Sequence, residues 1–360
     1  MNQPLFLHIV ERLEGFLGKL PATIQKPILH ELTPLKELFL KQRPPRFVLT
    51  GSHKLPVHEV FAALFAAVQA MDLRDVLMEV FRWQDLSAGG HGTISLLDAR
   101  GADEAALRKI EEELQREPAD MFLHLADGNS GRPVLTRDLE ILSTLIATNR
   151  ALQPAAKVVG ISLVSAAARN DDDKPSAARA AADSKLLAAL SGHASIREQL
   201  LQVLELPLLP LAEGEIAATS AAKRFMALMA RELPNEARVE MIRISGDRKA
   251  QTEIAQTLVK SASAISTAIG AQPIPLADLP ILTTLQLLMV SGIMYIAGRE
   301  RSLRAATEFV GALGVNVGAG MVLREGTRAV LKFFPGWGNV VWISESFMNP
   351  RRRSERMSTS

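Results

Sequence analysis

Short apolar runs alternate with longer amphipathic segments through the middle of the chain. The runs, between residues 47 and 165, predict strands, and the segments, which repeat apolar residues every three or four positions, predict helices. The predicted strands are FVLT (47–50), VLMEVFRW (76–83), TISLLD (93–98), MFLHLAD (121–127) and KVVGISLVS (157–165); the predicted helices are 58–71, 103–117 and 136–152. Such alternation needs crossover connections, so we predict an α/β fold with a mostly parallel sheet and helices on both faces.

The two ends of the chain follow a different pattern. Helical spacing precedes the prolines of KQRPPR, a short helix is predicted near SIREQLLQVL, and no strand pattern occurs after residue 215. A chain of 360 residues also exceeds the size at which one core usually stops growing. We therefore predict a helical lead-in at 1–44, an α/β domain at 45–214, an all-helical domain at 215–345 and a basic, disordered tail at 346–360.

Composition narrows the classes of function. The chain has no cysteine, which excludes disulfides and thiolate chemistry and fits a reducing cytosol. Its 41 basic and 39 acidic residues leave almost no net field to attract a polyanion, and only 5% of residues are aromatic, so nucleic-acid binding is not favoured. The first apolar stretch carries Glu11 and Glu14, unlike a signal peptide, and we expect a cytoplasmic protein.

The segment after the first predicted strand has the outline of a phosphate-binding loop without its chemistry. A P-loop has the pattern G-x-x-x-x-G-K-[ST]. With Gly51 as the first glycine, the second glycine, the lysine and the hydroxyl residue fall on Pro56, Val57 and His58. Lys54 is the only lysine or arginine in this loop, and an isolated surface lysine is usually just solvated.

Three stretches in order resemble the landmarks of Ras-like, and specifically Era-like, bacterial GTPases. They are PLKELFLKQRPPRFVLTG, TISLLDARG and MFLHLADGNSGRPVLTRDLEIL. The resemblance implies a P-loop-NTPase-like (Ras-like) fold. It also implies that Asp98 would hold magnesium through water and that the Gly101 amide would face the terminal phosphate. We interpret Gly51, Lys54, Asp98 and Gly101 as a vestigial nucleotide site.

The chain departs from this family at the residues that carry the chemistry. Pro56 removes a backbone N–H, Val57 supplies no charge, and His58 cannot replace the hydroxyl oxygen that magnesium prefers. At the strand that would recognise guanine, Val164 and Ala166 stand where the family has lysine and aspartate. No clear candidate exists for the switch threonine.

The same sheet edge offers residues for other kinds of site. A displaced base-reading group could come from Asp171–Asp173, although such a run is most often a solvated loop. A zinc site would use three histidines whose spacing is atypical: His53, His58 and His91. Acid–base chemistry would use paired carboxylates whose distance no spacing fixes: Glu59, Asp98 and Asp127. Alternatively, Asp98 caps the helix that begins near Asp103 or accepts from loop amides.

Residues 245–342 resemble a helical bacterial domain of unknown function (the DUF six-nine-seven family) that often follows GTPase domains. The resemblance lies mainly in PIPLADLPILTTLQLLM (273–289) and PGWG (335–338). Residues 279–298 form an uncharged stretch that is long enough for a membrane span. The polar residues within this stretch and the arginines that follow it favour a buried helical bundle instead. Membrane association through 279–323 or the basic tail, at the inner face of the membrane, is the alternative.

These patterns lead to one functional expectation and two rivals. We expect a GTPase-like protein that has lost GTP hydrolysis and acts as an interaction or regulatory module, with no cofactor and with a protein partner. The first rival is a divergent GTP-binding protein that uses GTP and Mg²⁺ through Lys54, Asp98 and Asp171–Asp173. The second is a membrane-associated structural protein. Neither the partner nor the oligomeric state follows from the sequence.

Overall fold

The structure is a computed structural model in which part of the chain is described. The chain divides into two compact units, 1–301 and 302–360, and all described residues lie in the first. The continuous described ranges are 41–51, 53–55, 81–88, 92–128, 135–165, 177–208, 220–270 and 278–299, with further single positions between 15 and 65.

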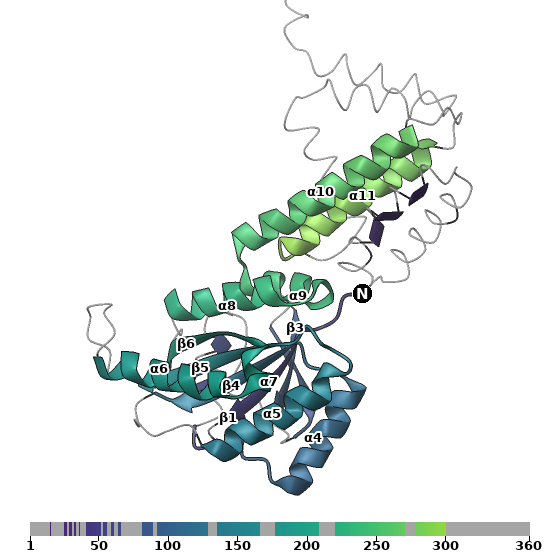
Figure 1. Cartoon of the computed structure of the whole chain (residues 1–360). Coiled ribbons are helices and arrows are strands. Elements are labelled where there is room, and N and C mark those ends of the chain that lie inside the picture. Colours follow the sequence, from purple (N-terminus) through teal and green to yellow (C-terminus); the bar gives the residue numbers. More distant parts are fainter. Residues whose placement is uncertain are drawn as a thin grey trace, which may run out of the picture. The chain divides into compact units, whose positions relative to one another are not determined.

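A six-stranded sheet forms the centre of the described unit (Figure 1). Its strand order is β2-β3-β1-β4-β5-β6, with β2 antiparallel to β3 and all other neighbours parallel. The strands are β1 Arg46–Gly51, β2 Trp83–Ser87, β3 Thr93–Asp98, β4 Met121–Asp127, β5 Lys157–Ser165 and β6 Leu200–Leu208. The predicted mostly parallel sheet is confirmed.

Two of these strands differ from the sequence-based expectation. The segment predicted as a helix near SIREQLLQVL contains only the short helix α7 (Ala194–Arg197), and the chain then enters β6. β2 begins at Trp83, where the predicted strand ended, and runs through the more polar WQDLS. β2 forms there because its residues pair in antiparallel register with β3, from Trp83 opposite Leu97 to Ser87 opposite Thr93.

One face of the sheet is covered by α4 (Glu104–Arg116), α5 (Thr136–Arg150) and α6 (Ala177–Gly192), as Figure 1 shows for α4 and α5. α4 begins where the Asp103 side chain accepts a hydrogen bond from the Ala106 N–H at 2.8 Å. Alternation along the strands decides which side chains face this layer, and Val48 and Phe122 belong to its core.

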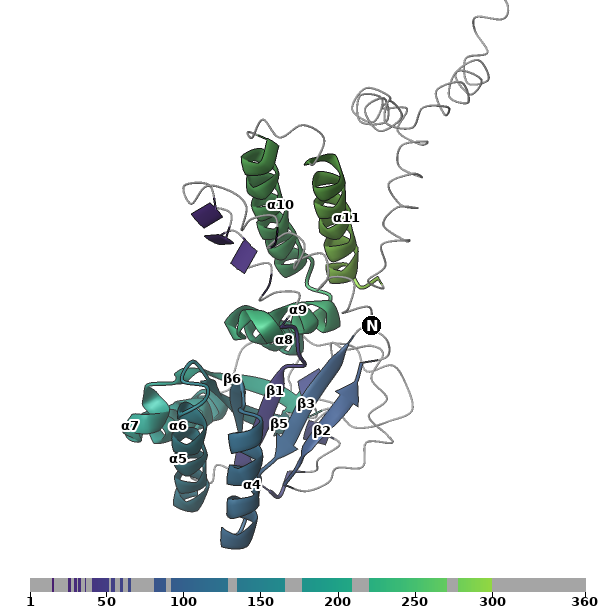
Figure 2. The ribbon, with the colours of Figure 1, turned by 90° about the vertical axis from the view of Figure 1, so that its right-hand side faces the viewer.

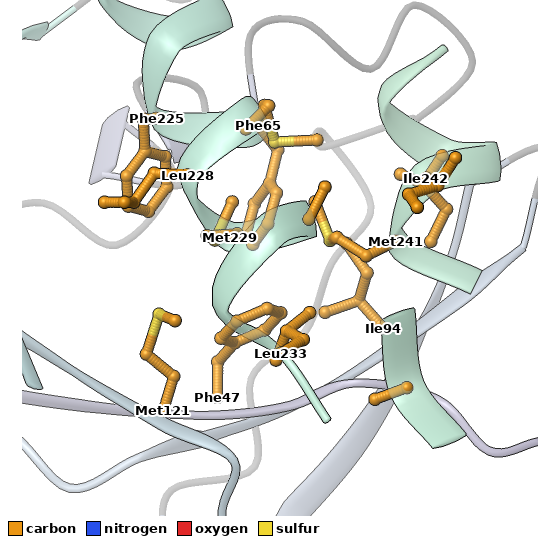
Figure 3. Close-up of a cluster of buried hydrophobic side chains, with 14 of the residues drawn as sticks. Phe47, Phe65, Ile94, Met121, Phe225, Leu228, Met229, Leu233, Met241 and Ile242 are labelled. Atoms are coloured by element: carbon orange, nitrogen blue, oxygen red, sulfur yellow. The ribbon is translucent and has the colours of Figure 1, made fainter. Parts of the chain in front are cut away.

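The opposite face is covered by α8 (Ser220–Glu232) and α9 (Asn235–Ser245). Figure 3 shows Phe225 and Met229 of α8 and Met241 of α9 in the same apolar cluster as Phe47 of β1 and Met121 of β4. The core is therefore continuous across residue 215, where the sequence predicts a boundary between two domains. Separate folding of the ranges 45–214 and 215–345 stays a prediction.

A helical hairpin follows, formed by α10 (Arg248–Gly270) and α11 (Asp278–Ile296), which lie side by side in Figures 1 and 2. Its Leu258 and Leu285 belong to the same core cluster as the sheet. Within the described part of the chain, no helix has both the length and the apolar character needed to cross a membrane. The predicted features beyond residue 299, which include PGWG and the basic tail, lie outside the described residues.

Candidate functional site

The strand order places the candidate site at the carboxyl ends of β1, β3 and β4. The chain builds β2 and β3 on one side of β1 and then crosses to β4 on the other side. In open α/β sheets, ligands bind in the crevice at such a reversal of strand order. Gly51 ends β1, Asp98 ends β3 and Asp127 ends β4, so the predicted residues lie at this edge.

Gly51 has a packing role that is visible in the backbone. Its φ is +94°, and a Cβ at this position would lie 2.2 Å from the carbonyl oxygen of Leu125 on β4. The two residues are opposite each other in the parallel register of β1 and β4. Glycine is therefore needed here to let two strands approach, independently of any phosphate.

The carboxylate of Asp98 is engaged by the arginine two residues further on. Asp98 Oδ1 accepts hydrogen bonds from Arg100 Nε at 2.8 Å and from the Arg100 backbone N–H at 3.1 Å, and Oδ2 accepts from Nη2 at 2.8 Å. Only 3% of the Arg100 side chain and 10% of the Asp98 side chain are exposed. The negative charge that would attract a metal ion is thus neutralised within the chain.

Arg100 also joins the loop after β3 to the loop after β1. Its Nη1 donates a hydrogen bond of 3.0 Å to the backbone carbonyl of Leu55. The Leu55 side chain is itself buried in the core that α8 and α9 cover. One guanidinium group therefore satisfies a buried carboxylate and fixes the position of the loop in which a P-loop would bind phosphate.

A second contact between these loops involves Gly101 and His53. Gly101 has a φ of +67°, and a Cβ there would lie 2.9 Å from the Cβ of His53. The residue predicted to face a terminal phosphate therefore has a side chain of the β1 loop directly beside it.

The first turn of α5 completes this edge. Burial raises the pKa of the Asp138 carboxyl, and the nearby His53 and Arg137 partly oppose the shift. Arg137 Nη2 also approaches the carbonyl oxygen of Ala102 at 3.4 Å. These α5 residues were not predicted as part of the site, because the helical pattern of TRDLEIL does not indicate which loops its first turn meets.

A buried histidine lies one residue before the paired Gly51 and Leu125. His124 of β4 is 1% exposed, and its Nδ1 lies 3.1 Å from the Oγ1 of Thr50 on β1, directly opposite. Burial lowers the pKa of His124 to about 4, so the imidazole is neutral at pH 7. The sequence signal for this residue was a single histidine within the apolar run MFLHLAD.

The remaining predicted residues are less informative. Lys54 is exposed, and Val164 is buried within β5. No group of three or more histidine, cysteine or carboxylate side chains among the described residues is arranged to hold a metal ion. Several predicted positions lie outside the described residues: Pro56, Val57, His58, His91, Ala166 and Asp171–Asp173. The zinc hypothesis and the displaced-carboxylate hypothesis therefore stay untested.

Comparisons with known proteins find similarity among solved structures. No protein-family model and no curated protein matches the chain. A crystal structure of a dimerization-deficient mutant of Toc33 from Arabidopsis thaliana is similar over 64% of this chain and 96% of that chain, with 12% sequence identity and a TM-score of 0.35. The assignment of the fold rests on the strand order and connections of the chain itself.

Proposed function

We propose that this chain is a GTPase-fold protein that has lost GTP hydrolysis and serves as an interaction or regulatory module. The supporting observation is the Arg100 side chain, which pairs with Asp98 and bonds the Leu55 carbonyl. We also propose that the fold is Era-like, with Gly51, Lys54, Asp98 and Gly101 as its vestigial nucleotide site.

A magnesium ion would have to compete with Arg100 for Asp98. Magnesium needs oxygen ligands, directly or through its waters, and keeps several waters even when bound. To recruit Asp98, it would have to break a buried, bidentate arginine pair, and separating such a pair costs about 3–5 kcal/mol when one charge is left unpaired. The loop offers nothing evident to offset this cost, because Pro56 lacks an N–H and Val57 lacks a charge. We therefore expect neither GTP nor Mg²⁺ as a cofactor.

The helical part provides the second half of the proposal. We propose that residues 245–342 belong to the GTPase-associated helical family of unknown function and face a protein partner. Fractionation of cells tests the membrane alternative: release of the chain by salt or carbonate would indicate peripheral association through 279–323 or the tail, and release only by detergent an integral state.

Calorimetric titration with GTP or GDP in the presence of Mg²⁺ tests the loss of nucleotide binding. We expect any Kd to exceed about 1 mM, which corresponds to a binding free energy weaker than about 4 kcal/mol. Micromolar binding that is abolished by Asp98→Ala would contradict the proposal. Binding abolished by Lys54→Ala, or by replacing Asp171–Asp173 with asparagines, would support the rival divergent site.

A pair of variants shows whether the arginine or the loop prevents binding. Arg100→Gln frees Asp98, and the same substitution combined with Gly, Lys and Ser at positions 56, 57 and 58 also restores the family's loop residues. We expect binding only in the combined variant, because the single change supplies no phosphate donors. Binding by Arg100→Gln alone would show that the arginine is the sole obstacle.

A further inference from the structure

A cluster of polar side chains lies at the opposite end of the sheet from the candidate site. It contains the side chains of Gln42, Glu240, Arg243 and Tyr295 together with the backbone N–H of Thr93, and we call it the Glu240 cluster. Its members come from the segment before β1, from the first residue of β3, from α9 and from α11. The proposed function uses none of them.

One carboxylate accepts all the central hydrogen bonds of the cluster. Glu240 Oε2 accepts from Gln42 Nε2 at 2.8 Å, from the Tyr295 hydroxyl at 3.0 Å and from Arg243 Nη1 at 3.3 Å. Its Oε1 accepts from the Thr93 backbone N–H at 3.0 Å. Only 12% of the Glu240 side chain is exposed, so these are largely desolvated, charge-assisted bonds.

The hydrogen bond from the Thr93 N–H to Glu240 takes the place of a bond between β3 and β1. Every second N–H of β3 points toward β1, as the bonds from Ser95 to Pro45 and from Ala99 to Leu49, both 2.9 Å, show. Thr93 is the next donor in this series. The segment before β1 contacts α9 instead, where the Arg43 N–H donates a hydrogen bond of 3.0 Å to the backbone carbonyl of Glu236. The Glu240 side chain supplies the missing acceptor.

The close fit of α9 against this corner depends on Gly92. A Cβ at Gly92 would lie 2.5 Å from Glu240 Oε1 and 2.9 Å from the Cγ1 of Ile244. A side chain at position 92 would therefore press on the Glu240 carboxylate and on Ile244, and its backbone would be strained at the φ of +150° that Gly92 adopts.

Tyr295 brings α11 into the same cluster. Its hydroxyl donates to Glu240 and accepts from Gln42 Nε2 at 2.9 Å, and the Arg243 guanidinium lies 3.7 Å from the centre of its ring. It is the single tyrosine of the chain. Movement of α11 away from α9 would therefore remove a partner from Gln42 and Glu240 together.

We propose that the Glu240 cluster is a coupling device that joins the α10–α11 hairpin to the segment before β1 and to the first residue of β3. A single carboxylate holds donors from its own helix and from three other parts of the chain, and loss of one changes how the others are satisfied. Displacement of α11 by a bound partner would thus reach the strands whose far ends carry Gly51 and Asp98. The inference does not depend on nucleotide binding.

Hydrogen exchange of the full chain, without nucleotide, tests the coupling. Tyr295→Phe removes the hydroxyl and keeps the ring against Arg243. We expect amide exchange to rise about 3- to 10-fold both in 285–296 and in the segments 41–46 and 93–98, because a lost hydrogen bond of this kind changes an opening equilibrium by about that factor. Thr267→Val is the matched control, since it removes a hydroxyl of the same hairpin that donates to the Ser263 carbonyl of its own helix.

A second variant in the same cluster shows whether the response follows loss of the Glu240 hydrogen bonds. Glu240→Gln keeps the side-chain volume but removes the charge, and we expect the same two regions to respond more strongly than in Tyr295→Phe. A rise confined to α11 in both variants would overturn the proposal, because α11 would then dock without engaging the sheet. Unchanged exchange in both variants would overturn it too.

Discussion

At the scale of single residues, polar groups placed inside the sheet layers shape this protein. Asp98 is paired with an arginine, whereas His124 is buried without an ionic partner and depends on the Thr50 hydroxyl. A desolvated imidazole resists protonation, so His124 makes the stability of the fold depend on pH.

His124 predicts a loss of stability in mild acid. Its pKa of about 4 in the folded chain lies below the ordinary value of 6.5, so between these pH values the unfolded chain binds a proton that the folded chain does not. The free energy of unfolding should therefore fall by roughly 3 kcal/mol as pH drops from about 6.5 to 4. Urea denaturation at a series of pH values measures this slope.

The variant His124→Asn isolates the contribution, because asparagine can hydrogen-bond near the Nδ1 position and does not titrate. We expect its stability to depend less on pH than that of the wild type across this interval. His193→Asn, which alters the residue before α7, is the control and should keep the wild-type slope. Equal slopes in all three proteins would show that His124 does not cause the effect.

At the scale of elements, the junction of β1 and β4 sets the shape of the candidate site. Gly51 and Leu125 meet near the carboxyl ends of both strands. The loop after β1 carries His53 and Leu55, and Leu55 accepts a hydrogen bond from Arg100 in the loop after β3. The position of these loops therefore depends on how closely the two strands approach.

Gly51→Ala should destabilise the fold by about 2–5 kcal/mol, through a left-handed φ and a clash with the Leu125 carbonyl. Thermal and urea unfolding measure the loss. Gly192→Ala is the matched control, because a Cβ at the end of α6 meets no atom within 4 Å and should change stability by less than about 1 kcal/mol. Equal stability of the two variants would contradict the packing role of Gly51.

Local patterns predicted the elements better than their connections. The alternation from 47 to 165 is enough to predict a parallel sheet, and D-x-x-G places Asp98 at its edge. The pairing of Asp98 with Arg100 depends on how the chain turns after β3, which no spacing encodes. β6 was missed because LLQVLELPL is half-buried along most of its length, so both of its faces carry leucine and the alternation is weak. The Glu240 cluster joins residues as far apart as Gln42 and Tyr295, beyond the reach of any local pattern.

At the scale of the whole molecule, the sheet and the helices that follow it share one apolar core. α8 and α9 cover strand residues that would otherwise face water, including Phe47, Ile94 and Met121. Each fully buried side chain of this size contributes about 1.5–3 kcal/mol, and typical domains have a net stability of only 5–15 kcal/mol. Exposure of this face would remove a large part of the stability.

A chain that ends at residue 214 should therefore fail to unfold cooperatively and should bind a hydrophobic dye such as ANS. A chain that ends at residue 247 keeps α8 and α9, and we expect it to regain a cooperative transition. Circular dichroism during urea titration compares the two. Cooperative unfolding of the shorter chain would show that 45–214 is an independent domain, as the sequence predicts.

The bridge from Arg100 to Leu55 has a consequence for regulation under the proposed function. A nucleotide-dependent switch needs two conformations whose populations change when the ligand binds. Here the group that links the two loops is the Arg100 side chain, so, unlike a bound nucleotide, it does not dissociate and is not hydrolysed. A binding partner that recognises this edge would meet the same shape in starved and in growing cells, and complex formation would follow how much of each protein the cell makes.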